Sequence, residues 1–134
     1  MMQEMFHKLV WIDHREARVY AYTREELRET AMLHAPDTTG HIHHTAGTPG
    51  AGHALPSKDF LRSVGDAIAD ARAILIVGPA QAKSELSQYL RDHMPLVAQR
   101  VLGQEPLGRL SVGELHAFAR RFFAHADRMG LAGK

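Results

Sequence analysis

Four of the ten histidines in this chain fall within one stretch of sixteen residues, "TTGHIHHTAGTPGAGH" (residues 38–53). Imidazole nitrogens and carboxylate oxygens are ligands that bind zinc and nickel, so a metal site is one chemistry this stretch could support. One hypothesis is therefore a metal-dependent hydrolase that holds its metal in this stretch. The candidate ligands are Asp37, His41, His43, His44 and His53.

The same stretch also fits a contact loop that holds no cofactor. Residues 36–55 are rich in glycine and have neither helical nor strand periodicity, which predicts a Gly/His-rich loop at about residues 36–56. Loops of this length inside compact domains are usually functional or disordered. Because a loop loses conformational entropy when it orders around a metal, a partner-contacting loop is the favoured interpretation.

A third interpretation of the histidines is a pH-responsive oligomer. Histidine side chains gain charge as the pH falls below about 6.5. In this hypothesis the loop reaches a second copy of the chain and its charge changes on acidification.

A second candidate site is the strand-to-helix junction "ILIVGPAQAK" (residues 74–83). Open α/β sheets bind ligands where such strands end, and a helix N-terminus attracts anions. Gly78 and Pro79 would form the junction and Lys83 would lie in the first turn or so of the helix, so an RNA phosphate could bind there. The alternative is that Gly78 and Pro79 only turn the chain and begin the helix.

Basic residues also recur along the last predicted helix. A strip of this kind either meets phosphate or forms a solvated outer face. The strip consists of His116, Arg120, Arg121 and His125, with Arg128 beyond it.

Two further groups of residues near the N-terminus could take part in chemistry. Asp13 and His14 could form an acid–base pair, but a charged turn is the favoured interpretation because neighbouring residues of a strand face opposite sides. Trp11, Tyr20 and Tyr22 could stack on RNA bases, or they could pack against a helix, as strand aromatics more often do.

The elements that position these residues begin with antiparallel strands. Residues 8–13 and 17–23 are short apolar and aromatic runs joined by the polar "HRE", which predicts a β-hairpin. Residues 26–34 are compatible with a helix, but a third strand that extends the hairpin into a meander is favoured.

The second half of the chain alternates helices and strands. Ser57 is expected to cap a helix, "AILIVG" (residues 73–78) reads as a strand buried on both faces, and Pro79 fits the first turn of a helix that ends at Pro95. The first of these helices carries a buried stripe formed by Phe60, Val64, Ile68 and Ala71.

The chain closes with a short strand around residues 100–102 and a last helix. Ser111 and Glu114 have the spacing of a capping box that begins this helix. Its apolar stripe is formed by Leu115, Phe118, Phe122 and Ala126. The predicted fold is α/β, a mixed β-sheet with an N-terminal hairpin or meander followed by α-β-α-β-α, with helices on both faces.

Composition limits the function classes. The 134 residues fit a single domain spanning 1–134, and 16 basic against 15 acidic side chains argue against a dedicated high-affinity nucleic-acid binder, while allowing a local basic patch. The absence of cysteine excludes disulfides, thiol catalysis and cysteine zinc sites. The sequence shows no membrane-length apolar run and no secretory signal, so a cytoplasmic location without membrane association is expected.

The run "AILIVGPAQAKSELSQYL", preceded by "FLRSVGDAIADA" and followed by "VLGQE" and "ELHAFARRFF", resembles the C-terminal domain of archaeo-eukaryotic peptide-chain release factors and Pelota. With "VWIDHREARVY" and the "HIHH" loop, the chain more closely resembles small bacterial proteins grouped with them as translational machinery proteins. The resemblance spans nearly the whole chain. It implies an α/β domain with helices on both sides of a mixed sheet. It also implies that this domain binds structured RNA or protein partners on the ribosome.

The resemblance also bears on catalysis. In the large factors this domain recruits a translational GTPase, and peptide release needs a Gly-Gly-Gln tripeptide on a separate domain. The sequence has no Gly-Gly-Gln and no recognised catalytic motif. We therefore expect a non-enzymatic binding protein that contacts the ribosome, RNA or a translation factor, in a role such as rescue or dormancy. Its expected contact residues are Gly78, Pro79, Lys83, Arg120 and Arg121.

Overall fold

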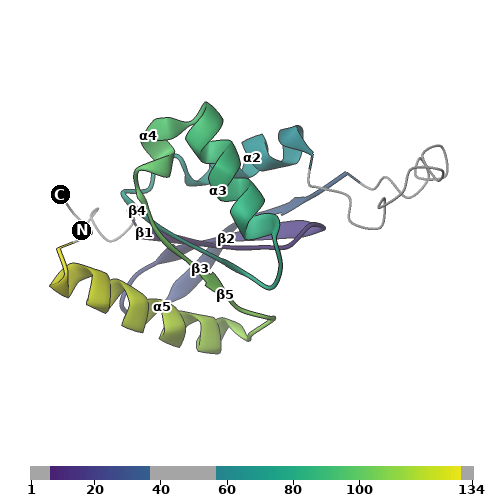
Figure 1. Cartoon of the computed structure of the whole chain (residues 1–134). Coiled ribbons are helices and arrows are strands. Elements are labelled where there is room, and N and C mark those ends of the chain that lie inside the picture. Colours follow the sequence, from purple (N-terminus) through teal and green to yellow (C-terminus); the bar gives the residue numbers. More distant parts are fainter. Residues whose placement is uncertain (1–6, 37–56, 131–134) are drawn as a thin grey trace, which may run out of the picture.

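An antiparallel meander and two parallel strands share one five-stranded sheet (Figure 1). The computed structural model describes residues 7–36 and 57–130. The strand order is β3-β2-β1-β4-β5, which confirms the predicted mixed sheet. Along the chain the elements are β1 (His7–Ile12), β2 (Glu16–Tyr22), β3 (Leu27–His34), α2 (Lys58–Ile68), β4 (Ala73–Gly78), α3 (Ala82–His93), α4 (Pro95–Ala98), β5 (Val101–Pro106) and α5 (Val112–Arg128).

The N-terminal meander forms as the alternation of residue types predicts. β1 and β2 pair antiparallel, and β3 pairs antiparallel with β2, so the third strand is confirmed over the helical alternative. The turn between β1 and β2 is held by Asp13, whose Oδ1 accepts hydrogen bonds from the backbone N–H groups of Arg15 (2.8 Å) and Glu16 (2.9 Å). This contact confirms the interpretation of "DHRE" as a charged turn.

The two parallel strands lie on the other side of β1. β4 pairs with β1 and β5 pairs with β4, both in parallel. All six residues of β4 are buried, which is why its sequence is aliphatic without alternation. Gly78 ends β4 beside β1, where an added Cβ would lie 2.0 Å from the carbonyl oxygen of Ile12. Only glycine fits this close approach of the two strands.

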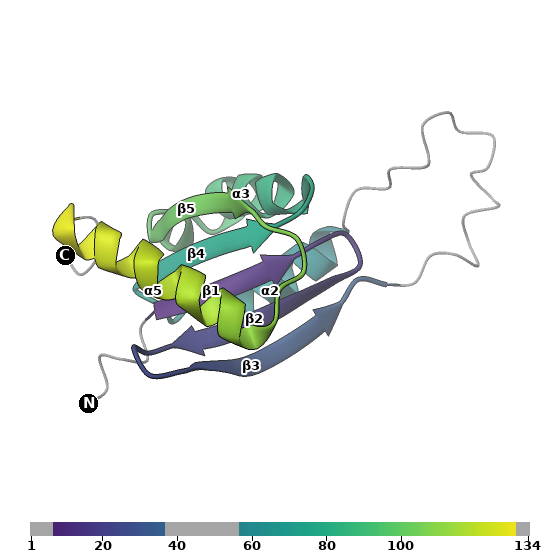
Figure 2. The ribbon, with the colours of Figure 1, turned by 90° about the horizontal axis from the view of Figure 1, so that it is seen from below.

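Helices cover both faces of the sheet, as predicted. In Figure 1, α2, α3 and α4 lie above the sheet and α5 lies below it, and Figure 2 shows α5 running across the sheet. Successive side chains of β1 point to opposite faces of the sheet, so the strand contributes to both cores. Val10 and Ile12 join the core under α2 and α3, whereas Leu9 and Trp11 join the core against α5.

Two serines begin helices as the sequence indicates. The Ser57 hydroxyl accepts from the backbone N–H of Phe60 (3.0 Å), which caps α2. The Ser111 hydroxyl accepts from the backbone N–H of Glu114, whose carboxylate accepts from the backbone N–H of Ser111, and this reciprocal pair caps α5.

Three details of the sequence interpretation were wrong. Pro79 lies before α3 rather than in its first turn, because the first helical hydrogen bond runs from the backbone N–H of Glu85 to the carbonyl of Gln81. α3 ends at His93, just before Pro95 as expected, but Pro95 also begins the short helix α4, which was not predicted. β5 is longer than the predicted strand around 100–102 and continues to Pro106, beside β4.

The predicted buried stripe of α5 is confirmed at its ends, Leu115 and Ala126, and wrong by one residue at its two middle positions. Ala119 and Phe123 are buried at the positions where Phe118 and Phe122 were expected. The two phenylalanines lie at the edge of the stripe and are partly buried against the same core. None of the helices in the described ranges is long and apolar enough to cross a membrane.

Candidate functional site

A cavity of about 970 Å³ lies where the second half of α5 crosses the start of β1 and the end of β2. Small side chains on α5 leave the space, because Ala117 and Ala124 project no bulk between longer neighbours. We call this cavity the arginine pocket. It is lined by His7, Tyr22, Thr23, Arg24, Ala117, Arg120, Arg121, Phe123, Ala124, Asp127 and Arg128.

Aromatic rings contribute the apolar part of the arginine pocket. The rings of Tyr22 and Phe123 have centroids 4.9 Å apart, and His7 meets Phe123 edge-on at the same centroid distance. Tyr22 and Phe123 are almost completely buried, so packing on both sides fixes them. These buried rings therefore form a rigid support behind the pocket rather than a face that a ligand can reach.

Four arginines surround this aromatic surface. Arg24 comes from the turn after β2, and Arg120, Arg121 and Arg128 come from α5; all four are exposed. No carboxylate in the described part of the chain lies within 4.0 Å of any of these guanidinium groups, and Asp127 is the single acid among the lining residues. The arginine pocket therefore carries a local positive field that the balanced overall charge conceals.

The ionisable groups of the arginine pocket respond to this environment. Burial raises the pKa of Tyr22, and the positive charges of Arg120 and Arg24 oppose that rise. Burial lowers the pKa of His7, and the negative charge of Asp127 opposes the decrease. His7 is therefore neutral at pH 7, and the positive charge of the pocket comes from the arginines.

The predicted contact residues fall on two surfaces. Arg120 and Arg121 lie on α5, whereas Lys83 lies on α3, on the opposite face of the sheet (Figure 1). The Lys83 ammonium donates to the carbonyl oxygen of Ala80 (2.6 Å), and Gly78 is buried against Ile12. The arginine pocket contains two of the five predicted contact residues, and the strand-to-helix junction contains the other three.

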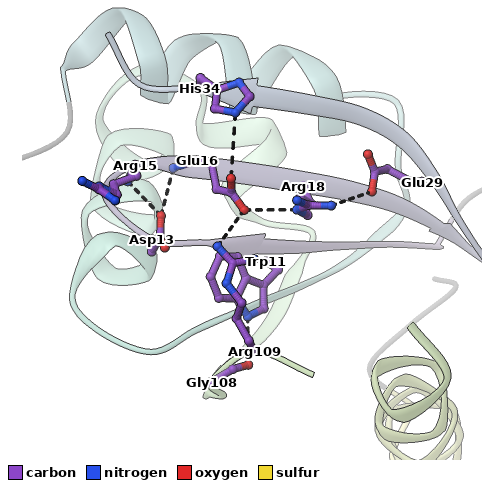
Figure 3. A network of polar contacts seen from close by, with 9 residues as sticks. All are labelled: Trp11, Asp13, Arg15, Glu16, Arg18, Glu29, His34, Gly108 and Arg109. Carbon is purple, nitrogen blue, oxygen red and sulfur yellow. Dashed lines mark hydrogen bonds and ion pairs between the residues drawn. The ribbon is translucent and has the colours of Figure 1, made fainter. Parts of the chain in front are cut away.

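A polar network occupies the end of the sheet where β1 finishes and β2 begins (Figure 3). Glu16 is its centre, and its Oε2 accepts from Arg18 (3.1 Å) and Arg109 (3.0 Å). The Arg109 guanidinium lies 4.7 Å from the centre of the Trp11 ring, and the Trp11 indole N–H donates to the carbonyl of Gly108 (3.0 Å). These contacts fix the segment before α5 against the β1–β2 turn.

The acidic and aromatic residues of the N-terminal strands have structural roles. Burial would raise the pKa of Glu16, but the hydrogen bonds and positive charges of Arg18 and Arg109 outweigh it and lower that pKa. Trp11, Tyr20 and Tyr22 are buried in the core against α5, so their packing role is confirmed. Asp13 and Glu16 are thus both engaged in structural contacts.

Sequence reasoning missed His7 and Arg24 as members of the arginine pocket, and it considered Tyr22 only together with Trp11 and Tyr20, not with the arginines. Arg24 and Arg120 are far apart in the chain, and no spacing pattern links them. His41, His43, His44 and His53 lie outside the described residues, as does Asp37. Within residues 7–36 and 57–130, no group of three or more histidines and acids could hold a metal ion.

No protein-family model matches the chain, and no curated protein matches it in sequence. Solved structures do match. The Pelota protein of Archaeoglobus fulgidus superposes with a TM-score of 0.62 and 12% identity over 86% of this chain and 30% of that one. For the Thermoplasma acidophilum Pelota the TM-score is 0.59, with 18% identity over 84% of this chain and 31% of that one.

An archaeal translation termination factor, aRF1, matches with a TM-score of 0.54 and 14% identity, over 92% of this chain and 39% of its own. Saccharomyces cerevisiae Dom34, a translation termination-like factor involved in RNA quality control that interacts with Hbs1, matches with a TM-score of 0.55 and 10% identity, over 89% of this chain and 36% of its own. This chain spans about a third of the length of these structures. At these identities the matches show the fold, and they confirm the predicted resemblance to release factors and Pelota.

Proposed function

We propose that this chain is a translation-associated binding domain that contacts RNA through the arginine pocket. The observation that carries the proposal is the set of four exposed arginines without a described carboxylate partner, arranged around a cavity that a buried aromatic cluster supports. The fold shared with Pelota, Dom34 and aRF1 supports a partner in the translation machinery. Ribosomal RNA would supply the phosphates.

The chemistry of the arginine pocket fits RNA in two ways. Guanidinium groups bind phosphate through paired hydrogen bonds, and their attraction for the backbone depends on salt. Unpaired bases of RNA also stack on guanidinium planes, which the four exposed arginines around the pocket offer. Binding rather than catalysis is proposed because Asp13 and Glu16, the acids nearest to the carboxyl end of β1, are used to hold the backbone and two arginines.

Co-sedimentation of the untagged protein with purified ribosomes, at about 50 mM and about 200 mM salt, tests the proposal. We expect salt-sensitive binding, and we expect the double variant Arg120→Ala/Arg121→Ala to bind about tenfold more weakly or worse. The slope of log affinity against log salt should fall by about one for each arginine that contacts phosphate.

The matched control is Arg62→Ala, which removes an exposed arginine from α2 on the opposite face of the sheet. It should leave ribosome binding unchanged, and all variants should unfold at the temperature of the parent protein. Equal losses in the control and in the double variant would contradict a specific role for the arginine pocket. Undiminished binding by the double variant would do so as well.

A further inference from the structure

A second, smaller cavity lies on the other face of the sheet, between α3, α4 and the edge strand β5. Its volume is about 270 Å³, and we call it the edge groove. Neither the arginine pocket nor the Glu16 network shares a residue with it. The edge groove is lined by Ser87, Arg91, Ala98, Val101, Leu102, Gly103 and Gln104.

The Ser87 hydroxyl is an unpartnered polar group in the wall of the edge groove. Ser87 is 5% exposed, and its Oγ has no hydrogen-bond partner among the described residues. Buried hydroxyl groups are hydrogen-bonded in the large majority of cases, so a missing partner in a cavity wall indicates a ligand that accepts or donates there. The other residues that line the groove indicate whether this ligand accepts or donates hydrogen bonds.

The neighbouring polar groups are donors. Arg91 follows Ser87 by one helical turn, so both side chains project from the same side of α3. Arg91 is exposed; it donates to Gln88 (2.9 Å) and has no carboxylate within 4.0 Å in the described residues. The Gln104 side-chain oxygen already accepts from Ser84 (3.4 Å), which leaves its NH2 group to donate. Three donors without a described acid favour a carboxylate ligand.

One side of the edge groove is lined by residues of an edge strand. β5 pairs with β4 on one side, and no strand of the described residues pairs with its other side. Four consecutive residues, Val101 to Gln104, line the groove, so it runs along the strand. An edge strand presents backbone N–H and C=O groups that a further strand can pair with.

We propose that the edge groove docks an extended acidic segment of a partner protein, which adds a strand to β5 and places a glutamate carboxylate against Ser87 and Arg91. In strand addition the main-chain hydrogen bonds supply affinity, and a pocket for an alternate side chain supplies specificity. The volume of about 270 Å³ fits one such side chain with its neighbours and lies below the range of drug-sized ligand pockets. The continuing strand edge therefore favours a peptide over a free small acid.

The probe is a mixture of capped pentapeptides with glutamate at the centre and valine, isoleucine, threonine or tyrosine at the other positions. A matched mixture has glutamine at the centre. In ¹⁵N-labelled protein we expect the glutamate mixture to shift the amide resonances of β5 and of the second half of α3. The glutamine mixture should bind about tenfold more weakly, because a charge-assisted hydrogen bond is lost.

Two variants test the assignment of donors. Arg91→Gln should bring the two mixtures to equal affinity, and Ser87→Ala, which removes only the hydroxyl, should weaken the glutamate mixture. Arg62→Gln on α2 is the matched control and should leave the preference for glutamate unchanged. The Arg120→Ala/Arg121→Ala variant should bind the peptides normally, which separates this site from the arginine pocket.

The proposal is overturned if no β5 resonance shifts at millimolar peptide, or if Arg91→Gln keeps the preference for glutamate. It is also overturned if free butyrate shifts the same resonances as strongly as the peptides do, because the groove would then be a small-acid site without strand addition. Because Arg91 is exposed, its variant is expected to fold, and the test holds even if Ser87→Ala does not.

Discussion

Replacing Glu16 with glutamine tests whether charge holds the segment before α5 to the sheet. Glu16 Oε2 accepts from Arg18 and Arg109, and Arg109 also covers the Trp11 ring (Figure 3). Glutamine keeps the size of the side chain and removes its negative charge. The variant therefore weakens two charge-assisted hydrogen bonds without leaving a cavity.

The expected loss of stability is about 2 kcal/mol at pH 7. Each hydrogen bond to a charged group contributes roughly 1.5–3 kcal/mol in a buried setting. The Glu16 side chain is 11% exposed, but that of Arg109 is 63% exposed, so solvent screens part of this gain. A loss of about 2 kcal/mol should lower the Tm by roughly 6–10 °C in a chain of this size.

The stabilisation by the Glu16 carboxylate should depend on pH in a defined direction. The folded-state pKa of Glu16 is lowered, so its carboxylate stabilises the fold fully above the ordinary glutamate pKa of about 4.3. That contribution is lost as the pH falls through the lowered folded-state pKa. The difference in unfolding free energy between the parent and Glu16→Gln should therefore be full at pH 7 and shrink toward zero below about pH 4.

Urea unfolding followed by tryptophan fluorescence measures this difference, because the chain has one tryptophan and Trp11 is buried in the fold. Glu29→Gln is the matched control. Its carboxylate is 37% exposed and contacts Arg18 at 3.4 Å, so its loss should cost less than about 0.5 kcal/mol. The reasoning is refuted if both variants lose equal stability, or if the Glu16→Gln difference stays constant between pH 7 and pH 3.

Two further outcomes are expected. Gly78→Ala should destabilise the fold by about 3 kcal/mol or prevent folding, because the added Cβ would lie 2.0 Å from the carbonyl oxygen of Ile12. The control Gly108→Ala should change the thermal unfolding temperature little, because an added Cβ there has no atom within 4 Å. Similar unfolding temperatures for the two variants would contradict this packing. We expect elemental analysis of the untagged protein to find far less than one zinc or nickel ion per chain. Near-stoichiometric metal that is lost on substitution of the histidines would instead favour the metal-dependent hydrolase, with the substitutions made at His41, His43, His44 and His53.

Much of the fold follows from local patterns in the sequence, namely the periodicity of apolar residues and the helix caps. The aliphatic run of β4 predicts burial on both faces, and Ser57 and Ser111 mark the starts of α2 and α5. The errors lie at element ends, as at Pro79, where a turn of three residues precedes α3. In the stripe of α5 only the two middle positions were misplaced by one residue, because Phe118 and Phe122 also pack at its border.

The functional surfaces depend on contacts that no local pattern encodes. Arg120 and Arg121 could be noticed in the sequence, but Arg24 joins them only because β2 ends beside the second half of α5. Likewise Glu16 meets Arg109 only when the segment after β5 returns over β1.

The sequence by itself determined the class of fold, the order of the elements and the faces that they bury, since alternation and caps act over a few residues. The tertiary structure alone decided which charges gather and which stay unpaired. The order of the strands and the placement of the helices bring distant residues together. Both depend on the packing of the whole chain. That is how a chain of nearly balanced charge comes to hold four arginines around one cavity.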